Sequence, residues 1–301
     1  MAGRNEPGPT ALRIMLGAHL RRLRERAAVS RADAGWAIRG SESKISRLEL
    51  GRVGFKERDV LDLLTLYDVR DEAERDRLVQ LARDANNPGW WHQYGDVTPD
   101  WFDAYLGLEA AAELIRTYEI QYVPGLLQIP EYTRAVAQLT ATGHRTESEI
   151  EQFVALRRTR QVMFDREPPL KLWAIVEESA LQRPIGGPDV LRAQLNALLD
   201  AIQRPNITLQ IIPTSSAGHA ASGGAFTVLR FPKPDLPDVV YLEHLTSALY
   251  LDKRDDVDAY TKILDTLAAT IPPPQETPAM LKSLIRRIRR SPKAGPPPQP
   301  E

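Results

Sequence analysis

The first 85 residues place hydrophobic side chains at helical spacing. Leu12, Leu16 and Leu20 recur four positions apart, as on one face of an amphipathic helix. Four similar stripes follow, and the five predicted helices span residues 10–26, 31–38, 42–50, 57–67 and 72–85. Five short helices with their own apolar faces predict a compact all-α domain.

Beyond residue 88 the pattern alternates between helical spacing and period-two spacing. Helices are predicted at 106–116, 130–139, 147–164, 190–202 and 255–267. Strands are predicted at 170–176, 207–211, 226–231 and 239–242. This mixture predicts an α/β (α+β) domain whose sheet has about four strands, in an order that the pattern leaves open.

Breaks in the pattern suggest the domain boundaries. Asn86-Asn87-Pro88-Gly89 interrupts the first helical stretch, and Ile271-Pro272-Pro273-Pro274 interrupts the second region. We therefore expect a disordered tail at 1–9, a helical domain at 10–87, an α/β domain at 88–271, and a Pro-rich break, basic helix (278–290) and disordered tail at 272–301. Aromatic residues gather just after the first break, at 90–105, where packing between domains is favoured over stacking on a ligand or on bases.

The predicted helix at 42–50 has clear signals at both ends. Ser41 suits the N-cap, and Gly51 can end the helix in a left-handed turn. Ile45 and Leu48 face one way, so this short helix must dock on neighbours and present its polar face outward.

The preceding helix, opened by Ser30, carries the small residues Ala34 and Gly35. Only Arg39 and Gly40 separate the two helices, and we expect Gly40 to supply a positive φ. A short helix, a tight turn and a capped second helix form a helix-turn-helix, in which the second helix enters the DNA major groove.

The charge distribution supports DNA binding. The chain has a net charge of −1, but residues 1–60 hold 13 Lys or Arg against 7 Asp or Glu. Neutralisation of phosphates is the main sequence-independent term in DNA binding. The basic part of the chain is therefore the part with the predicted helix-turn-helix.

Residue type and place on the helix suggest the DNA contacts. Glu42, Ser43 and Arg47 lie on the exposed start and next turn of the second helix, so they are the candidates for base edges. Basic side chains and helix N-termini beside the groove usually contact the DNA phosphates and so set the register of the protein on the duplex. The candidates for phosphate contacts are Ser30, Arg31 and Lys44.

Other chemistry is not favoured. The chain has no cysteine, which excludes disulfides and thiolate metal sites, and no apolar run is long enough to span a bilayer. Glu177-Glu178 and Glu243-His244 directly follow two predicted strands, and adjacent residues in extended backbone point to opposite faces. We expect no enzyme activity, cofactor or metal, and structural or surface roles for all five histidines, namely His19, His92, His144, His219 and His244.

The order of residues in the motif resembles the Cro/cI-like (Xre-type) repressor domain. The resemblance lies in Ser30-Arg31, Ala34-Gly35, Ile38, Ser41, Ile45-Ser46-Arg47-Leu48-Glu49 and Gly51. Two features depart from that pattern, because Arg39 stands at the usual turn glycine and Ala34 at a usually larger apolar position.

A more specific resemblance covers residues 11–271. The chain resembles the actinobacterial Xre-type regulators of the WhiJ-like group, which carry an uncharacterised C-terminal domain. The shared segments are Gly89-Trp90-Trp91-His92-Gln93-Tyr94, Tyr118 to Gln128 with Tyr132 and Ala135 nearby, Leu156-Arg157, Arg160-Gln161, Pro205 to Gln210 and Val240-Tyr241-Leu242-Glu243. This resemblance implies transcriptional control, often beside a small neighbour-encoded protein in an antitoxin-like pair.

Three functions remain open from the sequence. The favoured one is a cytoplasmic, sequence-specific DNA-binding regulator, dimeric on an inverted-repeat operator. The alternatives are an antitoxin-like protein that mainly binds a small protein partner, and a regulator that responds to a small molecule. Double-stranded DNA and a second copy of the chain are the expected partners, and no membrane is involved.

Overall fold

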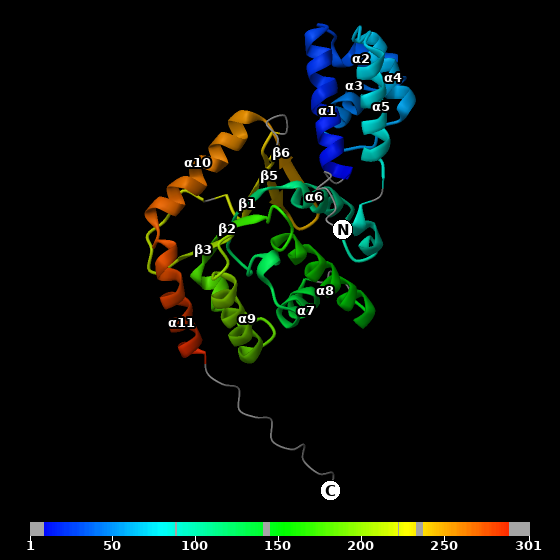
Figure 1. The fold of residues 1–301 in the computed structure, drawn as a ribbon. Helices are drawn as coiled ribbons and strands as arrows, with labels where there is room; N and C mark the ends of the chain where they lie inside the picture. Colours follow the sequence, from blue (N-terminus) through cyan, green and yellow to red (C-terminus); the bar gives the residue numbers. More distant parts are fainter. Residues whose placement is uncertain (1–8, 88, 141–144, 222, 233–236, 289–301) are drawn as a thin grey trace. The chain divides into compact units, whose positions relative to one another are not determined.

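The computed structural model describes residues 9–87, 89–140, 145–221, 223–232 and 237–288 (Figure 1). The chain forms two compact units, Met1–Leu114 with Leu229–Arg254, and Ile115–Val228 with Asp255–Glu301. Residues 1–8 of the tail predicted at 1–9 lie outside the described residues, whereas Pro9 is not part of a tail and begins the first helix. Residues 289–301, which hold the end of the predicted basic helix and the predicted C-terminal tail, also lie outside, as do His144 and Pro88.

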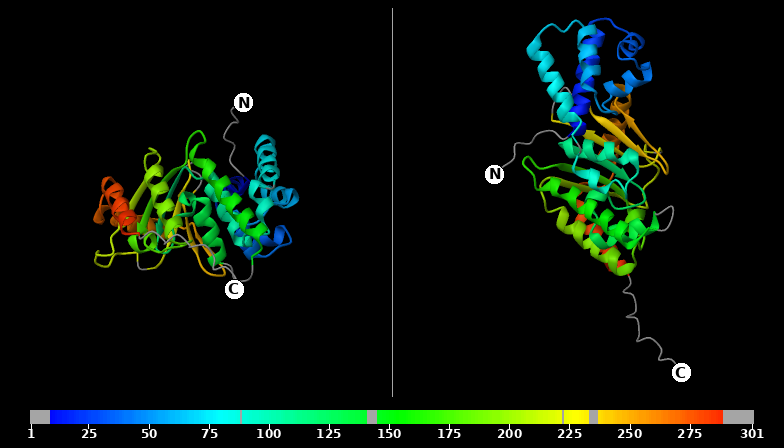
Figure 2. Two further views of the ribbon diagram at one scale, coloured as in Figure 1. Left: turned by 90° about the horizontal axis from the view of Figure 1, so that it is seen from below. Right: turned by 90° about the vertical axis from the view of Figure 1, so that its right-hand side faces the viewer.

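Five helices open the first unit, and each end agrees with its prediction to within one residue. They cluster together in Figure 1 and in both views of Figure 2. Their apolar stripes meet in one core, which includes Leu16, Leu20, Ile45 and Leu64. The helices are α1 (Pro9–Arg26), α2 (Arg31–Ala37), α3 (Glu42–Glu49), α4 (Glu57–Leu66) and α5 (Glu72–Ala85).

Helices α1 to α4 all end in the same way. Each is followed by a residue with positive φ, namely Ala28 (54°), Arg39 (54°), Gly51 (65°) and Asp68 (56°). The next N–H then donates to a carbonyl five residues back, as from Val29 to Arg24, Gly40 to Gly35, Arg52 to Arg47 and Val69 to Leu64. These are Schellman motifs, and glycine fills the left-handed position in only one of the four.

The expected positive φ at Gly40 is therefore wrong. Arg39 takes the left-handed conformation instead, because the helix-ending motif requires it one residue earlier. A Cβ at Gly40 would lie 2.8 Å from Cδ of Lys44. The absent side chain of Gly40 thus leaves room for the Lys44 side chain.

The helix predicted at 106–116 lies earlier than expected. Helix α6 spans Asp100–Ala111, and β1 (Leu114–Glu119) follows it directly. The four central residues of β1 are all buried, so the alternation that identifies a half-buried strand is missing from its sequence.

In the described residues, six strands form one sheet of the order β3-β2-β1-β4-β5-β6. The remaining strands are β2 (Lys171–Glu177), β3 (Ile207–Ile212), β4 (Phe226–Arg230), β5 (Val239–Glu243) and β6 (Ala248–Leu251). Strands β2 and β3 are parallel, with Leu172 opposite Ile207, and β5 and β6 are antiparallel, with Tyr241 opposite Tyr250. The mixed α/β character is confirmed, whereas the estimate of about four strands missed β1 and β6.

Helices of the second unit pack on one another and on the sheet. Helix α7 contacts α8 and α9, and α11 contacts α9 and β3. Helix α11 ends earlier than predicted, although residues beyond 288 lie outside the described part. The bounds are α7 (Pro130–Leu139), α8 (Glu147–Gln161), α9 (Pro188–Ala201), α10 (Arg254–Thr270) and α11 (Thr277–Arg287).

Buried amides hold the loop before α7. The Gln194 side chain accepts from the N–H of Ile129 at 2.9 Å and donates to the carbonyl of Leu127 at 2.8 Å. Gln128 donates to the carbonyl of Val123, and Gln161 donates to the carbonyl of Gln128, both at 2.7 Å. The segment Val123 to Ile129 is therefore fixed by side chains that satisfy its backbone.

The outer edge of β3 is covered by the start of α11. The Thr277 hydroxyl, which is buried, donates to the carbonyl of Leu209 at 2.6 Å. The Gln210 amide donates to the carbonyls of Ala268 and Pro272 at 3.2 and 3.0 Å. These contacts give hydrogen-bond donors to carbonyls of the strand and of the end of α10 that would otherwise lack them.

Candidate nucleic-acid interface

Helices α2 and α3 are capped and closely packed. The Ser30 hydroxyl accepts from the N–H of Asp33, and the Ser41 hydroxyl accepts from the N–H of Lys44. A Cβ at Gly35 would lie 2.9 Å from the carbonyl carbon of Ser41. Only glycine allows α2 to approach the start of α3 this closely.

A glycine also allows the other end of α3 to pack closely on α1. A Cβ at Gly17 in α1 would lie 2.4 Å from the carbonyl oxygen of Leu48 and 2.7 Å from that of Glu49. Ile45 and Leu48 point into the core and are almost completely buried. Both ends of α3 and its apolar side are therefore fixed by the helices around it.

A buried cluster of charges ties α3 to α1 and α2. The Glu49 carboxylate, in a residue only 5% exposed, accepts from Arg24 Nε at 2.5 Å and Nη2 at 3.2 Å. Arg31 Nε donates to the same carboxylate at 3.0 Å. The hydrogen bonds to Glu49 raise the pKa of Arg24, so its guanidinium stays charged although the residue is buried.

A second ion pair joins α3 to α4. Lys44 Nζ donates to Oδ2 of Asp59 at 2.6 Å, and Asp59 is only 5% exposed. Removal of Lys44 would leave a buried carboxylate without its cation, which is costly. Lys44 therefore contributes to the fold of the domain in addition to any contact with DNA.

The three candidates for base edges share one exposed surface. Glu42 and Ser43 are exposed on the first turn of α3, and Arg47 is exposed on the next turn. Because both ends of α3 are held, these side chains project from a rigid element. Such a surface suits hydrogen bonding to base edges in the major groove.

The three candidates for phosphate contacts are already engaged within the domain. Ser30 caps α2, Arg31 pairs with Glu49, and Lys44 pairs with Asp59. Arg31 and Lys44 remain about one third exposed at 36% and 30% of their side chains. Each retains further N–H donors, since guanidinium has five and ammonium three.

Several contributors to this site were missed from the sequence. Arg24 belongs to a basic run, Arg21-Arg22-Leu23-Arg24, that resembles a solvated helix face, yet Arg24 is buried. Nothing in the spacing pairs Asp59 with Lys44, which lies 15 residues away. The sequence also did not indicate that Trp36 on α2 is 85% exposed, which is unusual for so large an apolar side chain.

A different polar cluster lies in the second unit. Tyr118 donates to Oε1 of Glu177 at 2.8 Å, and Nε2 of His219 lies 2.8 Å from the same oxygen. The N–H of Ala221 donates to Nδ1 of His219, which leaves Nε2 as the protonated nitrogen. Burial and the bond to Glu177 raise the pKa of Tyr118. His219 is thus a hydrogen-bonded structural histidine, and among the described residues no group of three acidic or histidine side chains could hold a metal.

Two capped helices with a rigid polar face define a DNA-binding regulator of the helix-turn-helix class, and residues 15–78 match a helix-turn-helix domain. The rest of the chain specifies the family. Residues 102–283, more than half of the chain, match the domain of unknown function DUF5753, and the protein belongs to this family. No curated protein and no solved structure matches the chain. In the described part of the chain, no helix has the length and apolar character needed to cross a bilayer.

Proposed function

We propose that the protein is a sequence-specific transcription regulator that reads its operator with α3. The observation that carries this proposal is the exposed face of Glu42, Ser43 and Arg47 on a helix whose ends are locked by Gly17 and Gly35. Rigid presentation lowers the entropic cost of forming several hydrogen bonds at once. The helix-turn-helix match supports DNA as the ligand.

Each side chain of this face has a base that suits it. Arg47 can donate both arms of its guanidinium to O6 and N7 of guanine, and Glu42 can accept from N4 of cytosine. Ser43 can donate to or accept from either base of a pair. Arg31, Lys44 and the capped start of α2 at Ser30 then set the register on phosphates.

A two-fold dimer is the proposed functional form. One recognition helix covers only a few base pairs, so repressors of this class commonly place two helices about one DNA turn, roughly 34 Å, apart. The operator would then be an inverted repeat. We assign DNA binding to residues 10–87 and dimerisation or effector binding to residues 88–271, and the cytoplasm as the compartment.

The finer relationship rests on sequence resemblance. We place the chain in the WhiJ-like group of actinobacterial Xre-type regulators on the segments quoted above. A small neighbour-encoded protein partner follows from that resemblance alone.

Selection from a random DNA library with the full chain tests the proposal. We expect recovered duplexes to share a motif, and the motif to be an inverted repeat with half-sites one turn or a multiple of it apart. Recovery of unrelated sequences would overturn sequence-specific reading. If the chain were a strict monomer in sedimentation and still bound a single non-palindromic site at full affinity, only the proposal of a dimer would be overturned.

A further inference from the structure

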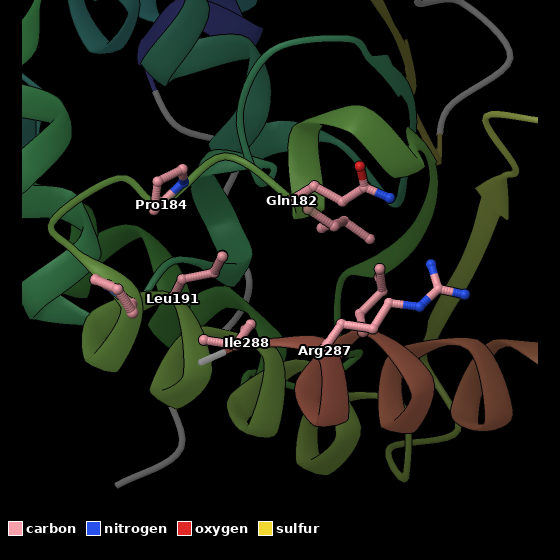
Figure 3. Close-up of a pocket in the computed structure, with 8 residues that line it drawn as sticks. Gln182, Pro184, Leu191, Arg287 and Ile288 are labelled. Atoms are coloured by element: carbon pink, nitrogen blue, oxygen red, sulfur yellow. The ribbon is translucent and has the colours of Figure 1, made fainter. Parts of the chain in front are cut away.

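A cavity of about 410 Å³ in the second unit is lined by the segment 181–191 and the end of α11. Figure 3 shows Gln182 and Pro184 on one side of it, and Leu191, Arg287 and Ile288 on the other. Its volume falls in the range of about 300–1,000 Å³ that small-molecule sites in proteins occupy.

The walls of the cavity are apolar and firmly held. Leu181, Leu191 and Leu284 line it and are themselves nearly or fully buried in the unit. Pro184 and Pro188 flank a tight turn that contains the positive-φ residues Gly186 and Gly187. The cavity is therefore preformed, so that an apolar ligand would enter it with little rearrangement of the chain.

The two polar residues that line the cavity, Gln182 and Arg287, both contact the carboxylate of Glu178. Glu178 Oε1 accepts from Nε2 of Gln182 at 2.9 Å, and Arg287 Nη1 lies 3.4 Å from the same oxygen. Glu178 Oε2 accepts from the N–H and the hydroxyl of Thr214. The Glu178 side chain is 12% exposed and its oxygens are occupied, whereas Arg287 is 67% exposed and offers more donors than this one contact uses.

The side of the cavity formed by α11 carries a positive charge, whereas Glu178 is the carboxylate beside Arg287. Lys282, Arg286 and Arg287 lie on α11, and the sequence from 277 to 293 contains no Asp or Glu. The negative end of α11 is also compensated, because Arg192 donates to the carbonyls of Ile285 and Ile288. An anionic group beside Arg287 would thus meet the guanidinium donors that Glu178 does not use, at a helix end whose negative charge Arg192 offsets.

We propose that this cavity binds a small carboxylic acid with an apolar body. The carboxylate pairs with the free donors of Arg287 at the rim, since a guanidinium fork matches carboxylate geometry. The apolar body lies against Pro184, Pro188 and Ile288, the apolar lining residues that are not fully buried. This site is separate from the DNA-reading face, and its occupation is measured without DNA.

Calorimetric titration of the full chain with decanoate, and with decanol as its uncharged counterpart, tests the site. Arg287→Gln should weaken decanoate binding by about tenfold or more, because a hydrogen bond to a charged group is lost. Arg286→Gln removes an equal charge from the neighbouring residue, which does not line the cavity, and should leave binding within about twofold. Pro184→Trp adds bulk at an exposed position of the rim and should abolish binding of decanoate.

The outcomes separate the proposal from its rivals. Tighter binding of decanoate than of decanol, with the order of variants given above, supports it. Equal losses in Arg286→Gln and Arg287→Gln would mean attraction by net charge alone and would overturn it. Unchanged binding in Pro184→Trp, or no saturation by about 1 mM decanoate in a folded wild-type chain, would also overturn it. Melting curves of every variant establish that each is folded.

Discussion

Nε of Arg24 in α1 lies 2.5 Å from Oε1 of Glu49 at the end of α3, and both residues are buried. Helices α1 and α3 are thus joined by a charge pair inside the core of the DNA-binding unit. The same pair also reaches the turn between α1 and α2, because Arg24 Nη1 donates to the carbonyl of Val29 at 2.9 Å.

Replacement of Glu49 by Ala should lower the free energy of unfolding by about 3–5 kcal/mol, because buried Arg24 would keep only the half-exposed Glu25, 3.6 Å from its Nη2, as a counter-ion. Urea unfolding followed by circular dichroism measures the change. Glu42→Ala on the exposed face of α3 is the control and should unfold like the wild type. An equally small effect of Glu49→Ala would show that water reaches Arg24.

Gly17→Ala should destabilise the same unit by about 1–3 kcal/mol, because the added methyl group would overlap backbone oxygens of α3 that cannot move independently. It should also weaken operator binding in the fraction that stays folded, through a displaced α3. Gly95→Ala is the matched control, since its Cβ would make an ordinary contact at 3.5 Å with the carbonyl oxygen of His92. Equal melting temperatures for the two variants would contradict the close approach of α1 and α3.

Substitution by glycine should stabilise the chain at the left-handed positions of the Schellman motifs that other residues occupy. Ala28 and Arg39 both adopt a φ of 54°, a conformation that costs L-residues about 1–2 kcal/mol. Ala28→Gly should therefore raise the stability by up to about 1 kcal/mol after the entropic cost of glycine. Ala27→Gly, one residue earlier and without a positive φ, should lower it instead. Thermal melting distinguishes the two, and a loss of stability in both variants would argue against the left-handed turn.

Arg47→Ala should weaken operator binding by about 1–3 kcal/mol and relax the preference at one base pair in each half-site. The fold should not change, because Arg47 is exposed and opposite the buried side of α3. Repetition of the library selection with the variant measures both effects. If the selected motif were unchanged, α3 would have to enter the groove in another orientation.

Arg31 and Lys44 should contribute affinity without discrimination. Arg31→Ala should reduce the slope of log K against log salt by about one unit and leave the motif unchanged. Lys44 needs a double variant, Lys44→Gln with Asp59→Asn, so that the buried carboxylate is not left unpaired, and Asp59→Asn alone is its reference. Arg70→Ala, which removes one exposed charge after α4, controls for net charge. A changed base preference in the Arg31 variant would assign Arg31 to base reading.

Most of the DNA-binding unit could be predicted because its signals are local. Caps such as Ser41, the glycine at 51 and stripes such as Leu16 and Leu20 act over a few residues, and the structure has them as expected. Contacts between distant residues could not be found in this way. Arg24 and Glu49 are 25 residues apart, and each is ordinary in its own segment.

The second part of the chain was harder to predict, because two of its strands lack the alternation of apolar and polar residues that identifies a half-buried strand. Strand β1 is buried on both faces, and β6 has only four residues, most of them half exposed. The candidate site shows the same division. The exposed face of α3 follows from helical spacing, whereas the ion pairs of Arg31 and Lys44 depend on neighbours that only the fold brings near.

The hydroxyl that covers the edge of β3 has a consequence for synthesis of the chain. Thr277 lies 68 residues after Leu209, and a ribosome makes the strand first. The nascent protein therefore carries an open β-edge until its last described helix emerges, and open edges recruit other chains. A stop codon shortly before residue 277 would make that brief condition permanent and would yield an insoluble product.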